Sequence, residues 1–266
     1  MLHADNLGGV IRDNHFKGDK GMKIGAFTDR GKTRKINEDN FFISDFNLES
    51  GNGYCIIADG MGGHNAGEVA SKIAIEKMKN HIQERYSEDM EKSQIIAILK
   101  EMMQKANRSI YWQSLQNKTQ AGMGTTAIFC LLHNSSMYIA HVGDSRVYLI
   151  RDNGMHQITV DHSIVAELVN SGSITREEAE HHPQKNVITR ALGGEQDTQV
   201  DIYVQQLETG DIILICTDGL TNMVRDTEIL SEMKKWDDLQ ITVEKLVRLA
   251  NDKGGLDNIT VVAVKI

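Results

Sequence analysis

Apolar and polar positions follow distinct patterns along the chain, and these patterns predict where strands and helices lie. The run Tyr54–Ala58 is apolar without alternation, which is typical of a strand covered on both faces. Stretch 22–29 alternates like an edge strand instead. Further apolar runs predict strands at 41–43, 125–132, 137–142, 147–150, 200–207, 211–216 and 259–266.

Two long stretches carry apolar residues at helical spacing. In 94–116, Ile95, Leu99, Met102 and Ala106 recur every three or four positions, which predicts a helix packed on one face. Stretches 68–83, 164–169 and 239–250 also predict helices. The strand-rich middle, with two long helices on one side and others on the far side, predicts layered α/β/β/α packing.

Acidic residues stand where several of the predicted strands end. Asp59 and Asp218 each follow an apolar run and precede a glycine, Asp144 lies between two runs, and Asp257 opens the closing run. An Asp-Gly pair after an apolar run is also a common hairpin turn, so one pair alone does not decide between a turn and a site. Because acids recur at several strand ends, a metal site is favoured over a set of unrelated turns. Oxygen ligands of this kind suit magnesium or manganese better than zinc.

Composition narrows the class of protein. The chain has 266 residues, of which 40% are hydrophobic and 25% charged, with one proline, and it carries a formal net charge of −8. These values are typical of a folded globule with a sizeable core. The negative charge argues against nucleic-acid binding, which requires a basic surface.

The remaining features of the sequence concern redox state, location and domain limits. Cys55, Cys130 and Cys216 each lie in an apolar run, so we expect buried free thiols. No apolar segment approaches the roughly 18 residues of a membrane helix, and we expect a cytoplasmic protein. Residues 1–21 are polar and without a period, so we expect them to be a flexible extension or an artefact. We expect residues 22–266 to form one domain. Segment 161–190 interrupts the strand rhythm and predicts a flap.

Short motifs in sequence order carry a resemblance to a known family. The chain resembles the bacterial form of the metal-dependent serine/threonine protein phosphatases of the 2C type over residues 22–266. The motifs are Thr28-Asp29-Arg30-Gly31, Arg34 to Asn40, Asp59 to Glu68, Gly122 to Thr126, Gly143 to Arg146, Asp161-His162-Ser163, Ile188 to Gly193, Thr217-Asp218-Gly219 and Asp257 to Thr260.

The resemblance implies an α+β fold, a four-layer α/β/β/α sandwich with two central antiparallel sheets flanked by helices. It also implies a binuclear Mn²⁺ or Mg²⁺ centre. The implied metal-site residues are Asp59, which would bridge both ions, the carbonyl of Gly60, which would bind one of them, Asp218 and Asp257, which would hold the other, and Asp144, which with Asp218 would hold a third, weaker ion. The other implied site residues are Arg34, which would bind phosphate, and Glu38 and Asp39, which would orient metal-bound waters.

The implied activity is hydrolysis of phosphoserine and phosphothreonine in proteins by a metal-activated water, opposing a serine/threonine kinase. We expect a monomer without nucleic-acid or membrane partners. Met61 stands where eukaryotic members of the family carry a histidine that protonates the leaving group. Methionine cannot donate a proton, so the acid is either a water on the third ion or His64.

Two other functions remain open at this point. A signalling module of the same fold could bind a phosphorylated partner without turning it over, although loss of ligands would mark such a module and every expected ligand position is present. A nucleotide-binding protein could use the glycines of 60–67 as a phosphate cradle, but the Gly-Lys-Ser/Thr ending of a P-loop is absent.

Overall fold

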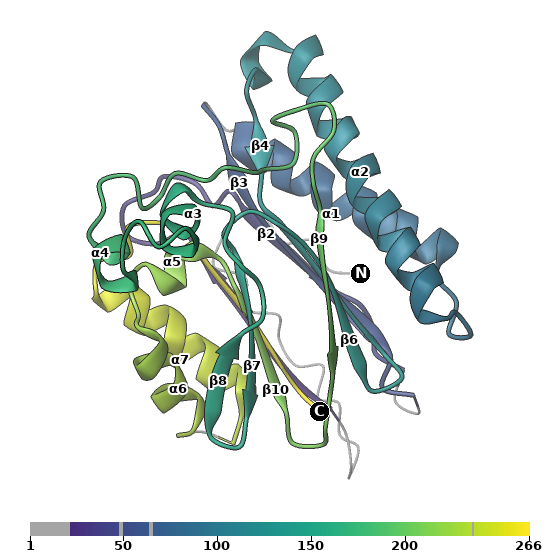
Figure 1. Ribbon diagram of the computed structural model, residues 1–266, viewed down its shortest axis with the longest axis vertical. Helices are drawn as coiled ribbons and strands as arrows, with labels where there is room; N and C mark the ends of the chain where they lie inside the picture. The colour runs from purple at the N-terminus through teal and green to yellow at the C-terminus, as the bar shows by residue number, and fades with distance from the viewer. Residues whose placement is uncertain (1–21, 48–49, 64–65, 236) are drawn as a thin grey trace.

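The computed structural model describes residues 22–47, 50–63, 66–235 and 237–266. Two antiparallel sheets form its centre (Figure 1). The first has the order β1-β11-β10-β7-β8. Its strands are β1 (Lys23–Asp29), β7 (Arg146–Arg151), β8 (Gly154–Gln157), β10 (Ile212–Cys216) and β11 (Ile259–Lys265).

The second sheet has the order β2-β3-β5-β6-β9, and the short β4 pairs with the end of β3. Its strands are β2 (Asp39–Ile43), β3 (Gly53–Met61), β4 (Gly124–Thr125), β5 (Ala127–His133), β6 (Ser136–Val142) and β9 (Asp201–Gln206). Consecutive strands β5 and β6 form a hairpin, as the apolar runs at 125–132 and 137–142 predict.

Helices cover the outer faces of both sheets, as Figure 1 shows. On the second sheet lie α1 (Ala66–Arg85) and α2 (Lys92–Gln116), and a short 3-10 turn, η1 (Lys118–Gln120), follows. The first sheet is covered by α5 (Asp218–Thr221), α6 (Asp226–Met233) and α7 (Leu239–Asp252). None of the helices in the described ranges combines the length and the apolar character that crossing a membrane requires.

Three hydrophobic cores separate the four layers. One joins α1 and α2 to the second sheet through residues such as Met78 and Phe129, and another fills the space between the sheets around Ile57 and Ile215. The third packs the other helices on the first sheet, with Leu246 among its members. The predicted four-layer sandwich is therefore confirmed, and the three cysteines are buried and free.

Three predicted features need correction. First, β3 does not end before the Asp59-Gly60 pair but continues through Met61, because Gly60 and Met61 pair with β4. Second, the Asp218-Gly219 pair opens a short helix, α5, which the apolar pattern does not predict. Third, β8 and α6 have no counterpart in the prediction. Helix α6 spans eight residues and buries only Ile229 and Met233, so its apolar pattern is short.

Segment 161–190 holds the two helices α3 (Ile164–Asn170) and α4 (Arg176–Glu180), neither of which has a fully buried residue. Ser163 begins α3 by accepting a hydrogen bond from the N–H of Ala166, and Thr175 and Glu178 form the predicted capping box at α4. The segment therefore lies outside the three cores. Residues 1–21 and His64, for which the sequence makes predictions, lie outside the described residues.

Candidate metal and phosphate site

Five aspartates from distant parts of the chain meet at one edge of the two sheets. Asp39 begins β2 and lies directly opposite Asp59 of β3. Asp218 begins α5, Asp257 precedes β11, and Asp144 lies in the turn between β6 and β7. The charge of Asp218 raises the pKa of Asp39, Asp59 and Asp144, so the carboxyl groups are close in space.

Four of these carboxyl groups, those of Asp39, Asp59, Asp144 and Asp218, resist ionisation. Burial is the largest cause in each case, and the charges of neighbouring aspartates add to it. Together they raise the pKa of Asp39 to about 7, of Asp144 to about 8 and of Asp218 to about 6, and the pKa of Asp59 well above its usual value. A nearby cation would relieve this repulsion and favour the charged forms.

Unpartnered oxygen atoms show where such a cation fits. Within the described part of the chain, Asp39 Oδ1 and Asp218 Oδ1 are buried and have no hydrogen-bond partner. A buried acceptor without a partner is costly, and a hard divalent cation satisfies it. No three His, Cys, Asp or Glu side chains of the described residues are placed to hold a metal by themselves. A metal here would also need backbone carbonyls and water, as magnesium usually does.

The second oxygen of Asp39 is held firmly. Asp39 Oδ2 accepts hydrogen bonds from the hydroxyls of Thr217, at 2.9 Å, and Thr260, at 2.6 Å. Both threonines are fully buried. Asp39 is 5% exposed, so its carboxylate has one fixed oxygen and one free oxygen inside the protein.

Glu38 precedes Asp39 at the start of β2, and its side chain faces the first turn of helix α1. The backbone N–H groups of Gly67 and Glu68 lie close enough to its carboxylate to lower its pKa, and its backbone oxygen accepts a hydrogen bond from the N–H of Gly60 at 3.2 Å. Burial raises the pKa of Glu38, while Arg34 and the two N–H groups oppose this rise. Glu38 therefore joins the end of β3 to the start of α1, and its role in orienting water stays a prediction.

The glycines after Asp59 and Asp218 are required by close contacts of the backbone. A Cβ atom on Gly60 would lie 2.0 Å from the carbonyl oxygen of Gly67, and one on Gly219 would lie 1.9 Å from that of Asn258. No side chain fits at either position. The repeated Asp-Gly pairs thus let other backbone segments approach the acidic edge.

Arg34 lies on the exposed side of the cluster. Its Nη2 atom is 2.8 Å from Asp257 Oδ2, and the two side chains are 47% and 29% exposed. Partial burial lowers the pKa of Arg34, but the carboxylates of Asp257, Glu38 and Asp59 outweigh this and raise it. A permanent positive charge therefore stands beside the acids and is accessible from solvent.

The turn that carries Asp144 is joined to the start of the predicted flap. The N–H of Gly143 donates to His162 Nδ1 at 3.0 Å, and the N–H of His162 donates back to the Gly143 oxygen at 2.8 Å. Arg146 pairs with Asp161 at 2.7 Å. Segment 161–190 therefore starts at the acidic edge, and its gating of the site stays a prediction.

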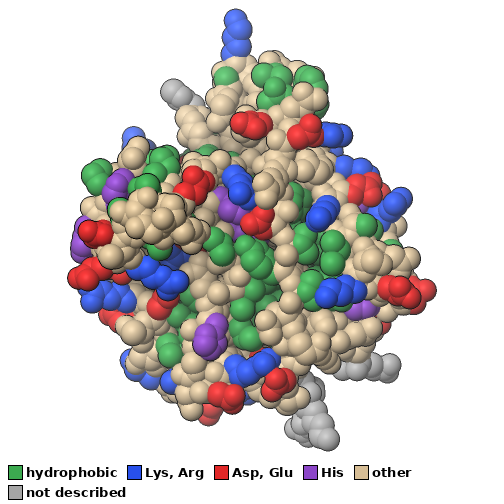
Figure 2. Space-filling view, in the orientation of Figure 1, with side chains coloured by type: hydrophobic (Ala, Val, Ile, Leu, Met, Phe, Trp, Pro, Cys, Tyr) green, Lys and Arg blue, Asp and Glu red, His purple; other side chains and the backbone are tan. Residues whose placement is uncertain are grey.

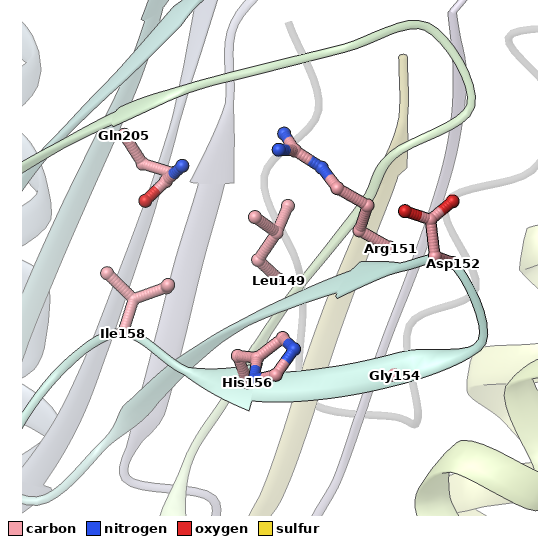
Figure 3. Close-up of a pocket in the computed structure, with 7 residues that line it drawn as sticks. All are labelled: Leu149, Arg151, Asp152, Gly154, His156, Ile158 and Gln205. Atoms are coloured by element: carbon pink, nitrogen blue, oxygen red, sulfur yellow. The ribbon is translucent and has the colours of Figure 1, made fainter.

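A pocket elsewhere in the fold does not contain the acids. It has a volume of about 400 Å³ and lies at the other end of β7 (Figure 3). It is lined by Leu149, Arg151, Asp152, Gly154, His156, Ile158 and Gln205. Arg151 is already paired there with Asp211 and Glu208. The acidic edge is the better candidate site because its polar atoms lack partners.

Figure 2 shows acidic and basic side chains mixed over the visible face.

Some residues of the site were not assigned a role by the sequence analysis. Thr217 and Thr260 occur in the quoted motifs, but their contact with Asp39 joins segments far apart in the chain. Asn258 accepts from the N–H of Glu38 and donates to the backbone oxygens of Arg30 and Ile36. In the sequence, Thr260 stands out only as a polar residue inside an apolar run.

The two-sheet sandwich with an acidic, arginine-bordered edge is the architecture of a metal-dependent phosphatase. The family model described as Protein phosphatase 2C matches residues 29–257. The serine/threonine phosphatase stp of Listeria welshimeri is 40% identical over 90% of this chain and 93% of its own. The chain belongs to the protein phosphatase 2C family.

Solved structures agree with this assignment. The S. agalactiae serine/threonine phosphatase superposes with a TM-score of 0.84 at 38% identity, covering 92% of this chain and 99% of that one. The catalytic domain of the serine threonine protein phosphatase PstP, solved in complex with two manganese ions, has a TM-score of 0.79 at 34% identity and covers 92% and 98%. The family's catalysis is metal-dependent, and its substrates are phosphoproteins.

Proposed function

We propose that this protein hydrolyses phosphoserine and phosphothreonine in other proteins at a centre of two Mn²⁺ or Mg²⁺ ions. Family membership makes it a protein phosphatase, and the serine/threonine phosphatases among its relatives support the choice of phosphorylated residue. The single observation that carries the proposal is the meeting of buried and half-buried aspartates, with the unpartnered Oδ1 atoms of Asp39 and Asp218, at one edge of the sheets.

The ligands follow from this cluster. Asp59 and the backbone carbonyl of Gly60 would hold one ion, and Asp59, Asp218 and Asp257 would hold the other together with water, since these side chains do not enclose an ion by themselves. Asp144, with Asp218, would hold a third, weaker ion. When bound, the ions supply an activated water and neutralise charge on the phosphate.

Protein side chains then position the substrate and the water. Arg34 can present its planar, always charged guanidinium to two oxygens of a phosphate dianion. Its contact with Asp257 keeps it at the exposed side of the acids, where a phosphate can exchange for the carboxylate. Asp39 has one free oxygen and Glu38 a fixed carboxylate, and both can orient water by accepting hydrogen bonds.

We further propose that the enzyme is a cytoplasmic monomer that opposes a serine/threonine kinase. A phosphatase acts on the products of a kinase, and the family's phosphoprotein substrates support this pairing. Segment 161–190 would contact the residues that flank the phosphorylated one, because it begins at the Asp144 turn and is held outside the cores.

Phosphopeptides test the proposed activity. We expect release of phosphate from phosphoserine and phosphothreonine peptides with Mn²⁺, little release from a phosphotyrosine peptide, and none with a chelator or from Asp59→Asn. Binding of the phosphopeptide without release of phosphate would identify a non-catalytic binding module instead. Release that continues in the presence of a chelator would contradict the metal centre.

A further inference from the structure

Asp39 is held from behind by a chain of hydroxyl groups. Thr260 of β11 and Thr217, just before α5, both contact Asp39 Oδ2. Thr260 Oγ1 lies 2.8 Å from the hydroxyl of Thr28, its partner in the pairing of β1 with β11. Asn37 Nδ2 donates to Thr28 Oγ1 at 2.9 Å, and Asn37 Oδ1 accepts from the N–H of Asp39 at 3.2 Å. The chain of contacts thus begins and ends at the Asn37–Asp39 segment.

The chemistry of the partners fixes the direction of each hydrogen bond. With a cation at the site Asp39 is ionised, and an ionised carboxylate only accepts, so the single hydrogen of the Thr260 hydroxyl then points to Asp39. Thr28 must then donate its hydrogen to Thr260 Oγ1, and Thr28 accepts from Asn37. The hydroxyl of Thr217 also donates to Asp39, while its oxygen accepts the backbone N–H of Thr260 at 2.9 Å. All donors therefore point toward Asp39 Oδ2, and such a chain is polarised along its length.

We propose that Thr260, Thr217 and Thr28 are positioning residues that hold Asp39 with Oδ2 occupied and Oδ1 free for a divalent cation or a water bound to it. This inference rests on the proposed metal centre. The two hydroxyls fill one carboxylate oxygen and leave the other without a partner. Asp39 lies opposite Asp59, so the fixed carboxylate belongs to the same face of the sheet as the predicted bridging ligand.

Valine would fit these positions equally well if packing alone mattered. Thr260 stands between Ile259 and Val261 in a strand that is buried along most of its length. A buried hydroxyl costs free energy unless it is hydrogen-bonded, and here it is bonded to the acidic edge. The threonine hydroxyls therefore serve the site and not the core.

The test compares Thr260→Val with Thr260→Ser. We expect Thr260→Val to weaken Mn²⁺ binding by about 10- to 100-fold in calorimetry of the metal-free protein, as loss of groups that hold metal ligands does. Serine keeps the hydroxyl, so Thr260→Ser should bind Mn²⁺ within about threefold of wild type if the hydroxyl is the cause. On a phosphopeptide, the valine variant should lose kcat with little change in KM.

Thr242→Val is the matched control. Thr242 of α7 is fully buried, and its hydroxyl donates to the backbone oxygen of Asp238, the residue that caps α7, at 2.8 Å. It should lower the melting temperature and leave Mn²⁺ binding unchanged. Thr217→Val and Thr28→Val are tested as well, in case Thr260→Val does not fold. The loss of Mn²⁺ affinity should be smallest for Thr28→Val, because Thr28 reaches Asp39 only through the hydroxyl of Thr260.

The outcomes separate this inference from the proposed function. The positioning role would be wrong if the three valine variants bound Mn²⁺ as tightly as Thr242→Val while Asp59→Asn abolished binding. The metal centre would then still stand. Equal losses in Thr260→Val and Thr260→Ser would also overturn the positioning role, because the hydroxyl would not be the cause. Unchanged Mn²⁺ binding in Asp59→Asn would instead overturn the proposed metal centre itself.

Discussion

Asp39 and Asp59 lie directly opposite each other on the neighbouring strands β2 and β3. Opposed like charges destabilise a sheet, whereas further along these strands the apolar Phe41 pairs with Ile57 and Phe42 with Ile56. Burial adds to the cost, and the pKa values of both acids are raised. This pair therefore lowers the stability of the metal-free protein, and a divalent cation would reverse the effect.

Asp59→Asn should therefore have opposite effects on stability and activity. The amide has the same shape without the charge, so we expect a higher melting temperature than wild type when metal is removed. The rise in melting temperature on adding Mn²⁺ should disappear, and so should turnover of a phosphopeptide. Thermal melts with and without Mn²⁺ measure the two effects on melting temperature, and phosphate release from the peptide measures turnover. The exposed Asp237→Asn is the control and should match wild type. A metal-free melting temperature below wild type would show that Asp59 stabilises the fold.

Arg34 and Asp257 give the second prediction. The guanidinium occupies Asp257 Oδ2, so its charge competes with a cation for the same carboxylate. We expect Arg34→Ala to raise the KM for a phosphopeptide strongly and to lower kcat only modestly, since phosphate is bound in the ground and transition states alike. The same variant should bind Mn²⁺ more tightly. The gain should be modest because both side chains are partly exposed.

Arg34→Lys separates the two roles of this arginine. Lysine keeps the charge but lacks the planar fork, so KM should rise while Mn²⁺ affinity stays near that of wild type. Calorimetry for Mn²⁺ and initial rates on the peptide provide the two measurements. An unchanged KM in Arg34→Ala would remove the arginine from phosphate binding.

Much of the fold follows from hydrophobic patterning, and particular residues show where patterning stops. The uninterrupted run at Tyr54–Ala58 is a central strand, and the apolar face of α2 packs on the second sheet as predicted. Strand β8 (Gly154–Gln157) is short and only partly buried, so it has no apolar period to detect. For such elements, tertiary contacts outweigh local sequence.

The site shows a similar division. The acids can be recognised in the sequence, because each borders an apolar run. The contacts of Asp39 cannot, because Thr217 and Thr260 are 178 and 221 positions away in the chain. The role of the Gly60 position also depends on the approach of Gly67, which only the packing of α1 against β3 creates. Long-range contacts that bring polar groups together leave little trace in a single sequence.

The ion pair of Arg151 with Asp211 leads to a pH-dependent prediction. Burial raises the pKa of Asp211, but Arg151 and the N–H of Glu208 outweigh this and lower it below its usual value. An acid whose pKa is lower in the folded state adds stability above its unfolded pKa, and this stability is lost as the pH falls through the folded pKa. Asp211→Asn should thus be less stable than wild type at neutral pH, and the difference should vanish in acid.

Urea unfolding over a range of pH measures this difference. Glu208→Gln is the control, because Glu208 contacts the same arginine at 2.7 Å but is 66% exposed. It should lower stability little at any pH, as exposed ion pairs do. A gap between Asp211→Asn and wild type that stays constant as the pH falls through the lowered pKa of Asp211 would mean that packing, not charge, sets the cost.

Asp144 leads to a prediction about the leaving group. It belongs to the turn between β6 and β7, which Thr126 and His162 hold through Ser145 and Gly143. Asp144→Ala should leave the fold and the binding of two Mn²⁺ ions intact, because the other acids remain. Turnover should fall if the third, weaker ion provides the proton that a serine alkoxide needs on leaving.

Two substrates with different leaving groups test this role. Nitrophenolate leaves without a proton, whereas the serine oxygen requires one, so a defect in proton donation affects only the second. We therefore expect Asp144→Ala to lose more kcat on a phosphoserine peptide than on p-nitrophenyl phosphate, at equal Mn²⁺ occupancy. Asp197→Ala is the control, because Asp197 pairs with Arg108 on the surface and should leave both rates unchanged. Equal losses on the two substrates would show that Asp144 acts on a step other than protonation, and His64 would be the next residue to change.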